Sequence, residues 1–198
     1  MDPKKIFGGL GVVLLLLWGL GRIVSHSSHA AGAGDGAASV SQTIPQDKWT
    51  VKQEASPMDS SKTVVLTLNA ENTIHGPIGD RTPSLIIRCK EGKTDAYVVT
   101  GMAASVEEDS EGGPSEDHQV RLRFDDNPPT TDRWSESTSH SGLFASDAVA
   151  FSKQLAGAQK FTFEFTPFDA NPAVAQFDLK GLSSHLPKVA EVCGWSVN

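Results

Sequence analysis

The 198-residue chain has only two cysteines, a single tyrosine and an excess of acidic over basic residues. Cys89 and Cys193 are too few and too far apart for a zinc knuckle, and they form no CxxC redox pair. The net charge of −7 removes the attraction to phosphate on which nucleic-acid binding depends, and it disfavours a basic domain on anionic lipid. We therefore expect no nucleic-acid partner.

Motifs of catalysis and cofactor binding are missing as well. The sequence has no HExxH or EF-hand pattern, no nucleotide-binding glycine loop and no Gly-x-Ser-x-Gly elbow. His140 and Ser141 are adjacent, and adjacent residues of a strand point to opposite faces. The remaining candidate ligands are isolated in sequence and are interpreted as surface histidines: His75, His118 and His185. The sequence thus predicts a protein that is not an enzyme, with no metal, no cofactor and no small-molecule substrate.

One long apolar run stands at the N-terminus. Residues 6–21 carry no charge, and extending the run past Arg22 to residue 24 gives 19 residues, about the minimum for a membrane-spanning helix. Lys4 and Lys5 favour a cytoplasmic N-terminus, so the rest of the chain would be translocated. A signal peptide cleaved after Ala30 is the alternative. The prediction is a single-pass inner-membrane protein with a periplasmic C-terminal domain, or a free periplasmic protein after cleavage.

The chain divides into three parts on this basis. Residues 1–24 are the membrane anchor or signal peptide, and residues 25–45 form a flexible tether rich in Ser, Ala and Gly, a composition that cannot build a core. Residues 46–198 are predicted to fold as one β-rich domain.

Short alternating segments fill that domain. Phe161, Phe163 and Phe165 alternate with polar residues, the pattern of a half-buried strand. Other predicted strands lie at 49–55, 63–68, 85–89, 95–100, 120–125 and 173–178, separated by Gly and Pro turns. This spacing predicts a mostly β (α+β) fold, either a β-sandwich or an open barrel.

Two short helices are predicted within the same domain. One runs to Gly157 with Ser146 as its N-cap, and it places Ala148, Phe151 and Leu155 on one face. The other carries Leu182, Leu186 and Val189 on one face, and Pro187 is expected to kink or shorten it.

A few residues of this domain point to a disulfide or to contact with a partner. Because an exported domain folds in an oxidising compartment, we expect a Cys89–Cys193 disulfide rather than two buried thiols. Arginines beside an aspartate on one strand face could grip a partner's carboxylate or backbone, although an exposed strand face held by cross-strand ion pairs is the favoured explanation. The candidates for partner binding are Arg88, Arg121, Arg123, Asp125 and Trp134, the last as a core or interface anchor.

The order of segments resembles the VasI/TagO family of type VI secretion-associated proteins. The segments that carry the resemblance are Trp49, 57–64, 83–89, 97–99, 120–125, 134–137 and 193–195. The resemblance implies a periplasmic accessory protein of bacterial envelope machinery without an established catalytic activity. Family members usually have a Cys-Tyr-Asp-like segment after the signal sequence, whereas this chain has its cysteine-free tether there. The resemblance therefore covers the β domain alone.

Two functions follow as expectations. The first is a non-enzymatic accessory or binding protein, held at the inner membrane by residues 6–24 and attached to a protein partner of a type VI secretion-like assembly. The alternative is an immunity or inhibitor protein that blocks a toxin or hydrolase in the periplasm, since an acidic surface suits a basic enzyme. An enzyme acting on envelope polymers would need a cluster of His with Asp or Glu in one pocket.

Overall fold

The computed structural model describes residues 47–107, 112, 113, 115 and 117–197. The predicted membrane segment and tether, residues 1–45, lie outside these residues. None of the helices in the described ranges has the length and apolar character needed to cross a membrane.

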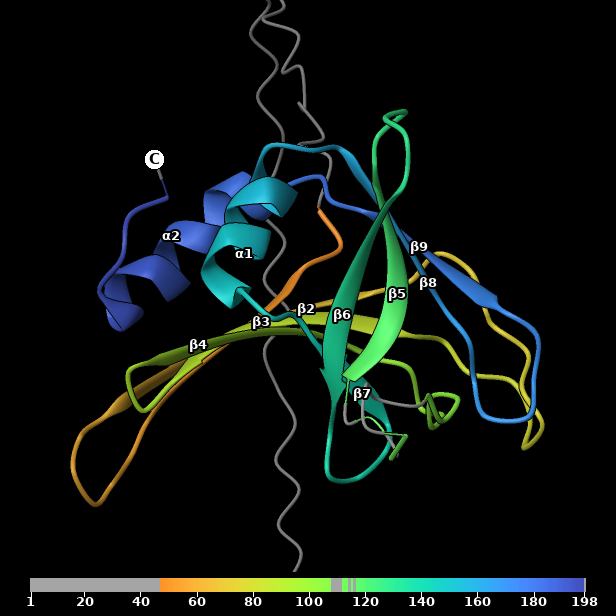
Figure 1. The fold of residues 1–198 in the computed structure, drawn as a ribbon. Coiled ribbons are helices and arrows are strands. Elements are labelled where there is room, and N and C mark those ends of the chain that lie inside the picture. Colours follow the sequence, from red (N-terminus) through yellow and green to blue (C-terminus); the bar gives the residue numbers. More distant parts are fainter. Residues whose placement is uncertain (1–46, 108–111, 114, 116, 198) are drawn as a thin grey trace, which may run out of the picture. The chain divides into compact units, whose positions relative to one another are not determined.

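Nine strands and two helices make up the described residues (Figure 1). The strands are β1 (Thr50–Ala55), β2 (Lys62–Asn69), β3 (Ser84–Lys90), β4 (Lys93–Val99), β5 (Asp117–Phe124), β6 (Thr130–Glu136), β7 (Gly142–Phe144), β8 (Lys160–Phe165) and β9 (Ala173–Asp178). The helices are α1 (Ala148–Ala156) and α2 (Leu182–Cys193). The mostly β prediction is confirmed. Strands β6 and β7 were not predicted, because in β6 only Trp134 is buried and β7 is three residues long.

All nine strands join one antiparallel sheet in the order β1-β2-β3-β4-β7-β6-β5-β8-β9. The last strand, β9, also contacts the segment that follows β2. Glu71 N donates to Gln176 O at 2.8 Å, and the Asn72 side chain bonds Val174 O and Gln176 N at 2.8 and 2.9 Å. The sheet therefore curls back toward itself. This arrangement is nearer to the open barrel than to a sandwich of two separate sheets.

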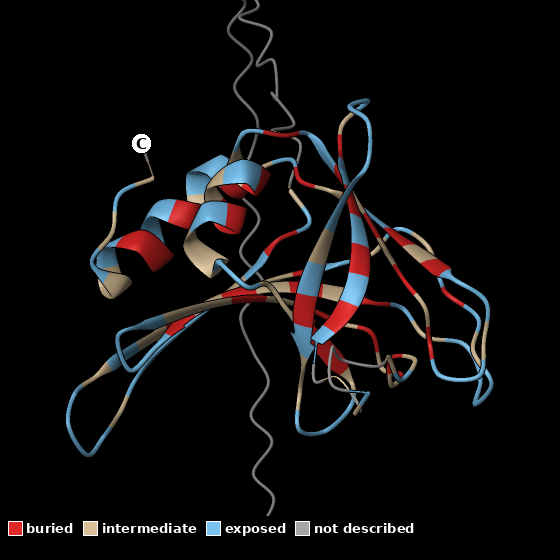
Figure 2. Ribbon diagram, viewed as in Figure 1, coloured by how far each residue is buried: buried red, intermediate tan, exposed pale blue. Residues whose placement is uncertain are grey.

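The core lies on the concave side of the sheet, beneath the helices (Figures 1 and 2). Period-two alternation sends every second residue of β2, β3, β5 and β8 inward, as the sequence pattern predicts. The inward residues are fully or nearly fully buried: Val64, Leu66, Leu68, Leu85, Ile87, Cys89, Val120, Leu122, Phe124, Phe161, Phe163 and Phe165.

Helix α1 contributes Phe151 and Leu155 to this core. Phe151 packs edge-on against Trp134 with ring centroids 5.0 Å apart. The predicted cap at Ser146 is wrong by one residue, since the Asp147 side chain accepts the Ala150 N–H at 2.9 Å. An aspartate at this position satisfies a free N–H and places negative charge at the positive end of the helix dipole.

Helix α2 buries Leu182, Leu186 and Val189, as predicted. It does not end at Pro187 but continues to Cys193. Pro187 lacks the N–H that would bond the Ser183 carbonyl, and both residues are exposed, so water can satisfy that carbonyl.

The predicted disulfide is present. Cys89 of β3 and Cys193 at the end of α2 are bonded, with their Cα atoms 5.7 Å apart. The bond ties the C-terminal helix to strand β3 and is typical of domains that fold in an oxidising compartment.

Candidate functional site

The convex side of the sheet is not uniform. Because Leu66, Ile87 and Ala96 point into the core, their neighbours in the sequence point outward. We call the outward residues of β2, β3, β4 and β7 the apolar outer face, which comprises Thr63, Val65, Thr67, Ile86, Arg88, Asp95, Tyr97, Val99 and Phe144. Every one of them is half-buried. Both helices pack on the opposite side of these strands, where α2 is joined to the inward Cys89 (Figure 1).

The centre of this face is a stack of three side chains. The rings of Tyr97 and Phe144 are stacked, with centroids 4.3 Å apart and planes inclined by 18°. The Arg88 guanidinium lies over the Tyr97 ring, 5.2 Å from its centroid. Arg88 Nε and Nη2 each lie 2.9 Å from Asp95 Oδ2, which fixes the guanidinium in place. Stacked aromatics with an ordered arginine are the composition of protein-binding hot spots.

The surroundings of Tyr97 shift the pKa of its side chain. Burial raises the pKa of its phenol above the ordinary 10.0, while the neighbouring Arg88 guanidinium lowers it and the Asp95 carboxylate raises it. The phenol therefore stays neutral at physiological pH and can act as a hydrogen-bond donor and acceptor on this face.

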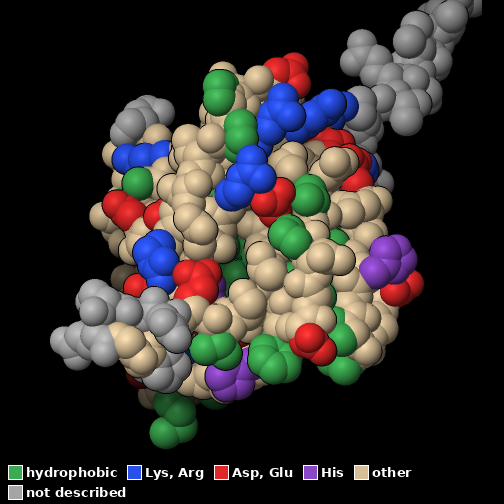
Figure 3. Space-filling model, turned by 45° about the vertical axis from the view of Figure 1, so that its right-hand side comes forward, with side chains coloured by type: hydrophobic (Ala, Val, Ile, Leu, Met, Phe, Trp, Pro, Cys, Tyr) green, Lys and Arg blue, Asp and Glu red, His purple; other side chains and the backbone are tan. Residues whose placement is uncertain are grey.

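The other half of the sheet presents a polar convex side. Arg121 Nη1 lies 2.8 Å from Glu164 Oε1 of the neighbouring strand. Arg123 Nε donates to Asn127 O at 3.0 Å. Figure 3 brings the β8–β9 side forward and shows Lys and Arg side chains next to Asp and Glu side chains. Cross-strand pairs of this kind stabilise a solvated face by little.

The predicted partner-binding residues are thus not brought together. Arg88 lies on the apolar outer face, whereas Arg121 and Arg123 lie on the polar half. Asp125 does not share their strand face, because β5 ends at Phe124 and Asp125 adopts a left-handed turn with φ 52°. Its Oδ1 accepts the N–H groups of residues 159 and 160, both at 2.8 Å.

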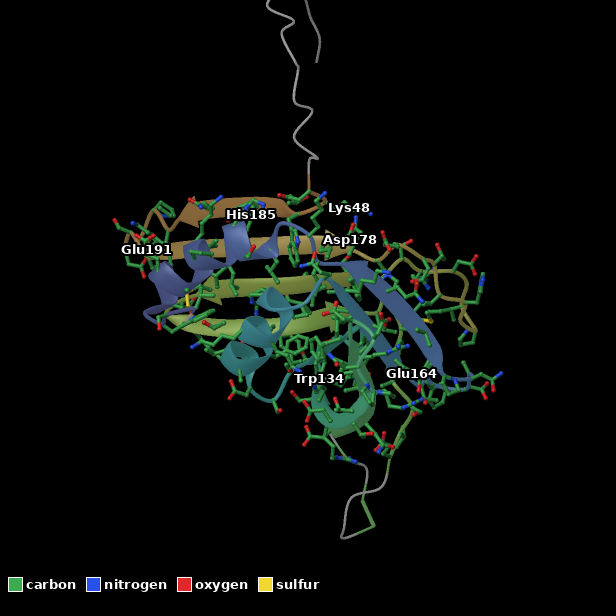
Figure 4. All side chains as sticks on the ribbon, turned by 90° about the horizontal axis from the view of Figure 1, so that it is seen from above. Lys48, Trp134, Glu164, Asp178, His185 and Glu191 are labelled. Carbon is green, nitrogen blue, oxygen red and sulfur yellow. A yellow bond between two sulfur atoms is a disulfide. The ribbon has the colours of Figure 1, made fainter. Side chains whose placement is uncertain are left out.

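Trp134 is the fifth predicted contact residue. Its side chain, labelled in Figure 4, is fully buried, and its indole N–H donates to Asp132 Oδ2 at 2.9 Å. Trp134 is therefore a core residue. Whether any of the other four contacts a partner stays a prediction.

A second feature is a hollow of about 660 Å³ at one end of the concave side. His118 lies opposite Trp134 in the strand register, and Glu136 follows Trp134 by two residues on β6. The side chains of His118 and Glu136 therefore point to the same side of the sheet as that of Trp134. The turn after β6 adds His140. The rim carries two exposed apolar side chains, Val106 and Phe168.

Polar groups converge on Glu136 in this hollow. Glu136 Oε2 accepts a short hydrogen bond from His140 Nδ1 and lies 3.9 Å from His118 Nε2. Glu136 Oε1 accepts the Ala104 N–H at 2.7 Å. His118 Nδ1 lies 2.8 Å from Ser105 O; since a carbonyl only accepts, this nitrogen carries the proton.

The sequence analysis missed this cluster, which is the combination of His and Glu in one pocket that an enzyme acting on envelope polymers would need. His118 was expected at the surface, but its side chain is only 7% exposed. The signal was present, because His118 continues the inward series of Val120, Leu122 and Phe124 by one step. Glu136 and His140 gave no such signal, since their meeting depends on the turn between β6 and β7.

The described residues thus define a disulfide-bonded domain of one curled antiparallel sheet and two helices, with an apolar outer face and a His/Glu hollow. No family model matches the chain, and no curated protein matches it. Among solved structures, the chain is similar to invasion associated protein B from Bartonella henselae, with a TM-score of 0.46, 9% identity and coverage of 73% of this chain and 93% of that one. Similarity at that level does not extend to function. The resemblance to the VasI/TagO family stays a hypothesis.

Proposed function

We propose that this is a non-enzymatic binding domain of the bacterial cell envelope and that it contacts a protein partner through the apolar outer face. The observation that carries the proposal is the contrast between the two halves of the sheet. Ion pairs such as Arg121–Glu164 cover one half, while on the other half Tyr97 and Phe144 form a half-buried aromatic stack beside Arg88. No helix among the described residues covers that stack.

The proposal commits to a protein as the occupant. A solvated sheet face has no need of outward apolar residues such as Val65, Ile86, Tyr97, Val99 and Phe144, because polar residues serve there at no cost in burial. Arg88 is already ordered by Asp95, so binding would immobilise few side chains. Arg121, Arg123 and Asp125 lie outside the apolar outer face and Trp134 is buried, so these four residues do not belong to this contact.

We also propose the setting in which binding takes place. Residues 6–24 hold the domain on the outer side of the inner membrane, and the disulfide supports a place outside the cytoplasm. The partner is then a component of an envelope assembly of the type VI secretion kind, on the strength of the ordered segments that resemble the VasI/TagO family.

Site-specific photocrosslinking in living cells tests the proposal. A photoreactive phenylalanine analogue replaces Tyr97 or Phe144, and in the control it replaces Thr162, a half-buried residue on the convex side of β8. We expect one crosslinked envelope protein, identified by mass spectrometry, from the two outer-face positions and not from Thr162. Equal crosslinking from all three positions, or adducts without any envelope component, would refute it.

A second candidate function, an immunity or inhibitor protein, is favoured by the net charge of −7. The outer face would then bind a basic toxin or hydrolase. A toxin gene directly beside this one, and protection of cells when both are expressed, would support it. Secretion-structure genes in that place, with no protection, would support the accessory function.

A further inference from the structure

We propose that a second copy of this chain pairs with the free edge of β1, so that the sheets of the two copies join in a symmetric antiparallel dimer. Strand β1 stands at one end of the strand order and pairs with β2 alone among the described residues. Figure 4 shows it in orange along one border of the sheet. This edge is separate from the apolar outer face, and the inference does not rest on the proposed function.

The two ends of the sheet differ in how their edges are satisfied. At the far end, the backbone of β9 is hydrogen-bonded beyond the sheet to Glu71 and Asn72. No residue in the described ranges bonds to the edge of β1 in this way. All residues of β1 except Val51 are exposed. An open strand edge with free N–H and C=O groups is a template for another strand.

The hairpin that follows β1 shows which of its backbone groups are free. Ser56 N donates to Ser61 O at 2.8 Å, one step beyond the last pair of the β1–β2 ladder, which includes Ala55. Hydrogen-bonded and non-hydrogen-bonded pairs alternate along an antiparallel ladder. The N–H and C=O groups of Val51, Gln53 and Ala55 therefore point away from β2, toward the open edge.

Charge selects one register for two such edges. With the two-fold axis at Gln53, this residue faces itself, and Val51 faces Ala55 of the second copy, so each free N–H meets a free C=O. Lys52 then faces Glu54 of the second copy. Opposite charges across an antiparallel pair stabilise it, and like charges destabilise it. An axis at Lys52 or at Glu54 would set like charges against each other.

The same two residues already form an ion pair within one chain. Lys52 Nζ lies 2.6 Å from Glu54 Oε1, and the side chains are 69% and 58% exposed, so this pair alone stabilises little. In the dimer each lysine lies beside two glutamates and each glutamate beside two lysines. A lysine on an edge strand ordinarily discourages pairing. The register at Gln53 removes that obstacle, because Glu54 of the second copy supplies the opposite charge.

Thiol crosslinking of the full-length protein in cells tests the contact. Gln53→Cys is treated with a short bismaleimide, which joins free thiols and leaves the bonded Cys89 and Cys193 unchanged. We expect a covalent dimer of this chain. The matched control is Gln176→Cys, an exposed glutamine on β9, whose edge is already hydrogen-bonded. The control should give no dimer.

Charge reversal tests the register. In the Gln53→Cys background, Lys52→Glu alone or Glu54→Lys alone should lower the dimer yield by about tenfold, because four like charges then meet. Both reversals in one chain should restore the yield. Production of the two single variants in the same cell should restore it as well, since the mixed dimer again pairs opposite charges. Circular dichroism verifies that each purified variant is folded.

Several results would overturn the proposal. One is a Gln53→Cys protein that gives no covalent dimer, or no more than Gln176→Cys gives. Another is a yield that single reversals leave unchanged or that the combined reversal does not restore. Crosslinking of Gln53→Cys to a different protein would assign the edge to that partner and would equally refute the dimer.

Discussion

Removal of the Cys89–Cys193 disulfide should destabilise the domain more than any single surface change. The two cysteines are separated by 104 positions, and the loop that their bond closes contains all eight strands and helices that follow β3. In the chain-entropy treatment, cross-linking a loop of this length stabilises the folded state by about 4.7 kcal/mol relative to the unfolded chain. The whole stability of such a domain is of order 5–15 kcal/mol.

Urea unfolding of oxidised and reduced protein measures the effect. With a urea dependence of about 2 kcal/mol per M, the midpoint should fall by about 2 M on reduction. Trp134 is fully buried, so tryptophan fluorescence follows the opening of the core. A variant with serine at both cysteine positions is the control, and reductant should not change its midpoint.

Two outcomes would refute this reasoning. One is a midpoint that moves by less than about 0.5 M, which would mean that loop closure contributes little. The other is full alkylation of both thiols in native protein isolated without reductant. Alkylation would also remove the support for an oxidising compartment.

Three further predictions concern the folded domain. Tyr97 is the only tyrosine, so its absorbance titration reports one group, and its pKa should lie above 10.0 and rise further in Arg88→Met. The stability that the buried neutral phenol contributes is complete below the pKa of the unfolded chain and should be lost as pH rises through the pKa of the folded protein. A pKa at or below 10.0 would contradict this. Leu186→Ala, at a fully buried site, should cost about 2–5 kcal/mol by urea unfolding, against under about 0.5 kcal/mol for the exposed Lys188→Ala, and equal costs would exclude the α2 packing. Asp125→Ala should lower the free energy of unfolding by about 1–3 kcal/mol, and Asp125→Asn by clearly less, because asparagine keeps the acceptor oxygen and tolerates the left-handed turn. Equal losses in chemical unfolding would disprove the role of Asp125 as the acceptor in this turn.

Local patterns in the sequence were enough to predict most elements. The alternation in Phe161–Phe165 and Val120–Phe124 identified β8 and β5, because one face of each strand meets the core and the other meets solvent. Pairing of the cysteines followed from the compartment, not from any pattern around them. Contacts that depend on turns could not be predicted in this way.

The apolar outer face left a signal that alternation alone does not interpret. The runs Val64–Leu66 and Leu85–Ile87 are apolar on both faces, whereas a strand with one solvated face needs only every second residue apolar. The helices cover the face to which Cys89 points, and α2 ends there at Cys193, the disulfide partner of Cys89. Arg88 then points outward, because it is the neighbour of the inward Cys89 in the strand.

The two candidate sites meet at the shortest strand. β7 pairs with β4 on one side and with β6 on the other, and it is the only strand that joins the two halves of the sheet within the described residues. Phe144 lies opposite Tyr97 on the outer face, and the preceding Leu143 lies opposite Glu136 of the hollow. Adjacent strand residues point to opposite faces, so the outer face and the hollow are presented on the two sides of one three-residue ladder. The outer face and the hollow lie on opposite sides of the sheet, yet both depend on the few backbone hydrogen bonds that β7 makes with β4 and β6.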